Sequence, residues 1–241
     1  LWRRSFWESL PEPAWTDADT DLSVVRALVA ARTIDVLPAP VYLLREREDT
    51  EDLSSLDTLT RRLTAVAELS ASLSGAARDL WDDRALRHDV RAVLVRLDDA
   101  DAAARERFFD LVNTYLETVA RSVLDGLPPL HRLNYFLVRK RQEERLLEAI
   151  TFQKSGELKK APVVRRGLHY FVRYPFFEDT AAGVPREIYR LNAELKVRQK
   201  TEGVQWRDGK LVVSGRVGIL NLRAGRRWQQ HLAAFAVNTD T

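Results

Sequence analysis

Three aspartates on alternate residues, Asp17, Asp19 and Asp21, are the side chains best suited to chemistry near the start of the sequence. Carboxylates at this spacing could bind a metal ion, act as a general base or cap a helix. A calcium loop of the EF-hand type needs Gly at its sixth position and Glu at its twelfth. This sequence has Leu22 and Leu28 at those positions, so an EF-hand is excluded.

The local sequence around these aspartates favours a helix start over a metal site. The D-x-D motif of nucleotide-sugar transferases ends an apolar strand, whereas here it follows the polar, proline-rich "LPEPAWT" and precedes a helical pattern. Aspartates at a helix start accept hydrogen bonds from free backbone N–H groups and complement the helix dipole, for about 0.5–2 kcal/mol per cap. An N-cap cluster therefore explains one or two of the carboxylates, and a role as base stays open for the remainder.

Two groups of cationic residues flank this helix. Arg45 and Arg47, in "VYLLRERED", could clamp a phosphate or pyrophosphate, or form a solvated strand end paired with the neighbouring acids. Arg4 lies in "RRSFW", where cationic and aromatic side chains could stack on a sugar or anchor a helix.

Composition excludes several kinds of site. The chain of 241 residues has no Cys, which removes disulfides, thiolate chemistry and Cys-based zinc sites, and its four histidines lack metal-ligand spacing. No apolar run reaches the ~20 residues of a transmembrane helix, and no signal-peptide pattern is present. Because the chain begins with Leu and contains no Met, we expect it to be a piece of a longer protein.

Charge is distributed unevenly along the chain. Residues 1–125 hold 16 Arg, no Lys and 24 Asp or Glu, a formal charge of −8. Residues 126–241 hold 22 Lys or Arg and 11 Asp or Glu, a formal charge of +11. This shift suggests two modules, of which the basic one could meet a polyanion or the acidic half itself.

Hydrophobic periodicity predicts an α+β chain. Apolar residues at helical spacing follow the aspartates, and two short proline-bounded strands are predicted after them. From residue 161 onward short alternating runs predict an antiparallel sandwich or small barrel, with Asp208 and Gly209 as a hairpin turn. The two strands are expected at Thr33–Leu37 and Pro40–Leu44, and the later helices at Leu56–Leu73, Ala76–Leu97, Ala102–Leu124 and Leu130–Phe152.

The stretch "KKAPVVRRGLHYFVRYP" interleaves basic and aromatic residues, as some nucleic-acid surfaces do. No RRM, KH, helix-turn-helix or zinc signature accompanies it, and a strand with one buried face explains the spacing equally well. We therefore expect no nucleic-acid partner.

The order of these features resembles a known family. "LWRRSFW", the acidic cluster opening "DLSVVRALVAA", then "TIDVLPAPVYLLRERED" and Ser54-Ser55 resemble the closing section of a family-2 glycosyltransferase GT-A domain. The later helices and "VPREIYRL…VQWRDGKLVVSGRVGILNL" resemble the middle of actinobacterial teichoic-acid enzymes that join such a domain to a CDP-glycerol glycerophosphotransferase domain. The resemblance implies three parts: residues 1–55 as the GT-A tail, 56–160 as a helical region, and 161–241 as a sandwich-like module.

The resemblance implies inverting transfer of a sugar from a nucleotide-sugar donor to a polyol-phosphate wall polymer. Asp19 occupies the place of the family's catalytic base, with Asp17 or Asp21 reachable by a small register shift, and Ala18 replaces the Glu that precedes the base in the family. Arg45 and Arg47 would face the donor phosphates or the acceptor loop, and Arg4 the acceptor.

The resemblance also places the nucleotide-binding half, with its D-x-D site for Mg²⁺ or Mn²⁺, before Leu1, so no cofactor is expected within this chain. A cytoplasmic location follows, with a peripheral place at the inner membrane face as an option. The alternative is a non-catalytic module that binds an anionic polymer or partner domain, or that oligomerises with its own copies through its basic residues.

Overall fold

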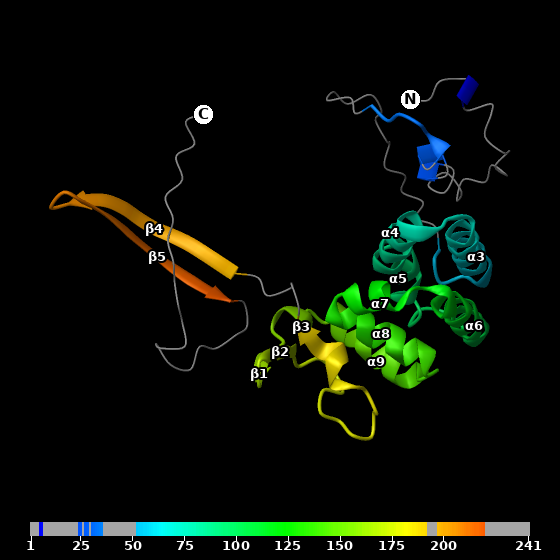
Figure 1. Ribbon diagram of the computed structural model, residues 1–241. Helices are drawn as coiled ribbons and strands as arrows, with labels where there is room; N and C mark the ends of the chain where they lie inside the picture. The colour runs from blue at the N-terminus through cyan, green and yellow to red at the C-terminus, as the bar shows by residue number, and fades with distance from the viewer. Residues whose placement is uncertain are drawn as a thin grey trace. The chain divides into compact units, whose positions relative to one another are not determined.

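The computed structural model describes residues 5–6, 24–25, 27–28, 30–35, 52–191 and 197–219. The described residues form helices and small antiparallel sheets, which confirms the predicted α+β class (Figure 1). Contacts divide the chain into two compact units, Leu1–Thr151 and Phe152–Thr241. The three predicted domains, with bounds at residues 55 and 160, stay a prediction.

The first unit is a bundle of helices between residues 52 and 151. Its core is made of leucines, valines and aromatic residues, including Leu59, Phe108, Leu116 and Leu133, each at most 1% exposed. Helix α3 packs against α4, α5 and α6, and α6 packs against α8. The helices are α3 (Leu56–Ser72), α4 (Gly75–Arg87), α5 (Asp89–Leu94), α6 (Ala102–Thr118), α7 (Arg121–Gly126), α8 (Pro129–Arg139) and α9 (Glu143–Lys154), the last of which crosses the boundary between the units.

Side-chain caps fix where the two longest of these helices begin. Ser55 Oγ accepts a hydrogen bond from Thr58 N at 3.4 Å before α3, and Asp101 Oδ1 accepts one from Ala104 N at 2.7 Å before α6. Each cap satisfies an N–H group that has no partner within the helix. The predicted helix Leu56–Leu73 is confirmed to within one residue.

The other three long helices predicted from the sequence are each broken into two. His88 is non-helical and separates α4 from α5, and Val119 and Ala120 are extended between α6 and α7. Between α8 and α9, Arg141 has a left-handed φ of 50° and its guanidinium hydrogen-bonds Asp110 and Glu106 on α6. The break at Arg141 therefore coincides with a tertiary contact, and all three breaks lie where the hydrophobic periodicity continues.

The second unit contains a small three-stranded antiparallel sheet. Strands β1 (Val163–Arg166), β2 (His169–Val172) and β3 (Arg190–Leu191) follow in the order β1-β2-β3, after the 3₁₀ turn η2 (Glu157–Lys159) and around the 3₁₀ turn η3 (Arg186–Tyr189). Tyr189 is fully buried, packs edge-on against Phe177 at 5.3 Å and donates its hydroxyl to Pro175 O at 2.8 Å. An aromatic cluster thus holds this sheet to its loops.

A separate two-stranded hairpin follows in the same unit. Strands β4 (Val197–Arg207) and β5 (Lys210–Ile219) pair antiparallel through a turn in which Asp208 and Gly209 have φ of 50° and 71°. Two positive φ values in a two-residue turn match the right-handed strand twist, so the predicted hairpin is confirmed. A bulge interrupts the pairing between Thr201 and Gly203.

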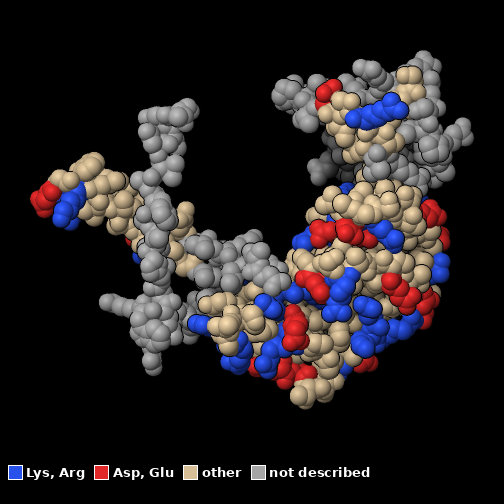
Figure 2. Space-filling view, viewed as in Figure 1, with Lys and Arg blue, Asp and Glu red and all other residues tan. Residues whose placement is uncertain are grey.

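The two sides of the hairpin differ in polarity. Leu211, Val213 and Val217 of β5 alternate onto one side, and Val213 and Leu211 pair with Val204 and Trp206 of β4. All five side chains are at least half exposed, with Trp206 at 73%. Lys210, Ser214 and Arg216 alternate onto the opposite side. Figure 2 shows a hairpin face largely free of charge, with charges gathered at the turn.

The strand predicted at Thr33–Leu37 is wrong at the residues that the structure describes. Residues 33–35 of the predicted strand Thr33–Leu37 are irregular, and the rest of that strand and Pro40–Leu44 lie outside the described residues. In the described parts of the chain, no helix is both long and apolar enough to cross a membrane.

Candidate functional site

The residues that the resemblance assigns to catalysis and binding lie outside the part of the chain that the structure describes. Val24, Val25, Ala27, Leu28 and Ala30 are helical, in agreement with the helix expected after the aspartates. The roles assigned to the residues before and after it stay predictions: Asp17, Asp19, Asp21, Arg4, Arg45 and Arg47.

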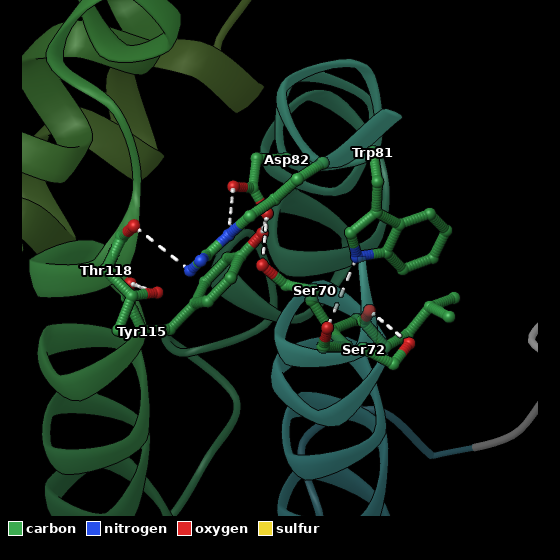
Figure 3. Close-up of polar contacts among 9 residues, drawn as sticks. Ser70, Ser72, Trp81, Asp82, Tyr115 and Thr118 are labelled. Carbon is green, nitrogen blue, oxygen red and sulfur yellow. Dashed lines mark hydrogen bonds and ion pairs between the residues drawn. The ribbon is translucent and has the colours of Figure 1, made fainter. Parts of the chain in front are cut away.

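A buried group of polar side chains surrounds Asp82 of α4 (Figure 3). Its Oδ1 accepts hydrogen bonds from Ser70 Oγ of α3 at 2.7 Å and from Tyr115 Oη of α6 at 2.6 Å. Asp82 and Ser70 are each 1% exposed and Tyr115 is 4% exposed. One carboxylate therefore joins three helices inside the core.

Arg78 supplies the opposite charge from one turn earlier on α4. Its Nε lies 3.7 Å from Asp82 Oδ2, and its Nη2 donates to Thr118 O, at the end of α6, at 3.1 Å. A cation at the C-terminus of a helix complements the dipole there. Arg78 thus offsets the cost of burying a carboxylate and links α4 to α6 a second time.

The acidities around Asp82 indicate a structural role. Burial raises the pKa of Tyr115 well above its ordinary value, and the hydrogen bond to the Asp82 carboxylate raises the pKa further. Tyr115 therefore stays a phenol that donates its proton to Asp82 and does not serve as a base. With both partners buried, a substrate atom has no access to this carboxylate, and we assign the cluster to stability.

An open groove on the first unit lies along α3. It has a volume of about 760 Å³ and combines two threonine hydroxyls with two acidic and two basic side chains. Such a lining could hydrogen-bond a polar ligand but offers no unbalanced charge to select one. The lining residues are Leu56, Asp57, Thr60, Arg61, Thr64, Ala65 and Glu68 of α3 and Arg107 of α6.

No family model, curated protein or solved structure matches this chain. Within the described ranges, no group of three or more His, Cys, Asp or Glu side chains could hold a metal ion. The Mg²⁺ or Mn²⁺ site that the resemblance expects before Leu1 stays a prediction.

No feature of the sequence was recognised as predicting the cluster around Asp82. Ser70 and Tyr115 lie 12 and 33 residues from Asp82, so no short motif brings them together. One local signal did exist: Asp82 precedes Leu86 by one helical turn and follows Trp81, both of them buried, which puts a carboxylate on the apolar side of α4.

Proposed function

We propose that this chain is part of an inverting glycosyltransferase that transfers a sugar from a nucleotide-sugar to a teichoic-acid-type polymer of the bacterial cell wall. The observation that carries the proposal is the order of features over residues 1–55: the aromatic and basic start, the acidic helix opening, and the Arg-x-Arg before Ser54. Each of these features also occurs in unrelated proteins. The proposal is supported by their occurrence in the same order as in the family.

In the proposed reaction Asp19 accepts the proton of an acceptor hydroxyl as its oxygen attacks the anomeric carbon. The new C–O bond forms on the face opposite the leaving nucleoside diphosphate, whose bond to that carbon breaks, so the configuration inverts. A carboxylate fixed at a helix start suits this role because proton removal must coincide with attack at a defined position. Arg45 and Arg47 would balance the charge of the departing diphosphate.

The proposal is tested by the variant Asp19→Asn in the longer protein that includes the donor-binding half. Loss of a general base lowers transfer by about 100- to 10,000-fold, and Asn keeps the capping oxygen, so folding is preserved. Asp17→Asn and Asp21→Asn are matched controls. Full activity in all three variants would show that none of these aspartates is the base, and loss only in a control would move the role to that residue.

We further propose that residues 161–241 form a sandwich-like module that includes the hairpin β4–β5. A two-stranded hairpin is marginally stable alone, and this one presents a continuous apolar side around Trp206 and Val213. A second layer over that side would supply the missing burial. A cytoplasmic location is part of the same proposal.

A second candidate function is the binding of an anionic polymer by the basic half of the chain. The observation that favours it is the formal charge of +11 over residues 126–241. Lys160 and Arg165 are exposed, and the guanidinium of Arg165 lies 6.0 Å from the ring of Tyr170. The two candidates are compatible, because a transferase must hold its acceptor polymer.

A further inference from the structure

The junction of α4 and α5 gathers cationic side chains opposite the start of α8. Tyr135 of α8, which is 3% exposed, donates its hydroxyl to Leu86 O near the end of α4 at 2.5 Å. His131 lies four residues before Tyr135 and so shares its side of α8. This packing brings His131 to the place where α4 ends and α5 begins.

Arg87, the last residue of α4, is fixed in position at this junction. Its Nε donates to the two carboxylate oxygens of Asp83 at 2.8 and 2.7 Å, and its Nη2 donates to Gly126 O at 2.9 Å. Gly126 ends α7, three residues before α8 begins. Arg87 thus spans from α4 to the loop that leads into α8.

His88 and Arg91 complete the group. His88 is the non-helical residue between the helices and is exposed, and Arg91 follows it by about one turn on α5. Arg91 Nε and His131 Nδ1 are buried atoms with no hydrogen-bond partner among the described residues. Polar nitrogens in such positions normally have a partner.

The pKa of His131 responds both to burial and to the cationic groups near it. Burial lowers the pKa of His131 to about 4, and the charges of Arg91, Arg87 and His88 lower the pKa in the same direction, opposed only weakly by Asp83. Arg91 also acts on the pKa of Tyr135, with Asp89 opposing it. These effects agree with the hydrogen bonds, in which Tyr135 meets Leu86 and Arg87 meets Gly126, so that the end of α4 lies near the start of α8.

We propose that Arg87, His88, Arg91 and His131 form a binding site for a phosphate group, either free or in an ester. A tetrahedral phosphate presents several acceptor oxygens to donors that approach from different elements, whereas a carboxylate presents two. Three of the four residues, Arg87, His88 and Arg91, come from the half of the chain that carries a net charge of −8, so their positive charge is opposite in sign to the net charge of that half. The site is independent of the proposed glycosyl transfer.

The test follows the imidazole ring of His131 by nuclear magnetic resonance in the whole chain. The His131 signal is identified among those of the four histidines because it is absent from a His131→Gln variant. Inorganic phosphate then replaces chloride at constant ionic strength. A bound dianion favours the charged imidazole, so the His131 resonances should shift saturably and the pKa should rise by about 1 or more. Dimethyl phosphate, a diester, is titrated in parallel; a response to either species supports the site.

Two variants with equal loss of charge separate a site from a general effect of salt. Arg91→Gln should abolish the saturable shift of the His131 resonances. The control is Arg96→Gln, which should keep the shift, because the Arg96 guanidinium lies at the surface, 3.8 Å from Asp99. If circular dichroism shows that Arg91→Gln does not fold, His88→Asn at the exposed position replaces it and should weaken binding several-fold. Absence of a His131 response to both phosphates, or an equal response in the Arg91 or His88 variant and the wild type, would overturn the proposal.

Discussion

Asp82 shows how a single residue can hold the first unit together. Its carboxylate accepts hydrogen bonds from two hydroxyls and faces Arg78, while only 1% of it is exposed. Buried charges of this kind add little net stability when complete, yet removal of one partner leaves the others unpaired in the core. We therefore expect the cluster to favour this packing of α3, α4 and α6, since another packing would leave these groups unpaired.

Replacement of Asp82 by Ala should destabilise the chain by about 3–5 kcal/mol, because Ser70, Tyr115 and Arg78 lose their common partner. Tyr115→Phe removes one hydrogen bond to a charged group and should cost about 1.5–3 kcal/mol. Urea unfolding followed by far-ultraviolet circular dichroism measures both effects.

The matched control for these variants is Asp79→Ala, an exposed carboxylate on the same helix, which should change stability by less than about 0.5 kcal/mol. Equal stability of the Asp82 and Asp79 variants would contradict a structural role for the cluster.

At the scale of elements, the hairpin β4–β5 has two adjacent valines that face opposite sides. Val213 belongs to the apolar side with Trp206 and Leu211, and Val212 lies between Lys210 and Ser214 on the polar side. The two are 61% and 37% exposed in the described structure, so exposure alone would rank Val213 as the more tolerant position. If the proposed second layer covers the apolar side, Val213 becomes the less tolerant of the two positions.

Val213→Asp should accelerate amide hydrogen exchange in β4 and β5 by at least about tenfold, because a carboxylate would be placed under an apolar layer. Val212→Asp introduces the same group one residue away and should change exchange far less. If the two variants behave alike, the apolar side is not covered and the sandwich-like module is wrong.

Helix starts and turns could be predicted from the sequence where they depend on residues close by in the chain. The start of α3 at Leu56 and the turn Asp208-Gly209 between β4 and β5 depend on neighbouring residues, and both were predicted correctly. The break at His88 was not predicted. The break at Arg141 occurs where its guanidinium meets Asp110 and Glu106, which are distant in the sequence, and it was not predicted either. The cluster around Asp82 was missed for the same reason. The predicted catalytic residues lie outside the described residues, so their roles remain to be tested.

At the scale of the whole molecule, the separation of charge along the sequence is the dominant feature. The basic half should bind inorganic polyphosphate in a manner that weakens steeply as salt screens the attraction. The double variant Lys160→Glu and Arg165→Glu should lower the affinity of the whole chain by about tenfold or more at low salt. Fluorescence anisotropy of labelled polyphosphate measures this.

A second double variant, Arg96→Glu and Arg121→Glu, changes the net charge equally but lies in the acidic half and serves as the control. It should reduce affinity less than about twofold. Equal losses in the two double variants would show that net charge alone, with no localised surface, governs binding.

The bulge between Thr201 and Gly203 has a consequence for how β4 is compared with other sequences. On the uninterrupted partner β5, Val213, Gly215 and Val217 face one side, and they pair with Val204, Thr201 and Gln199. Even-numbered residues after the bulge and odd-numbered residues before it therefore belong to the same side. The bulge thus shifts the alternation of side chains along β4 by one residue. An alignment that inserts or deletes one residue before residue 202 would exchange the two sides of the hairpin along the first half of the strand.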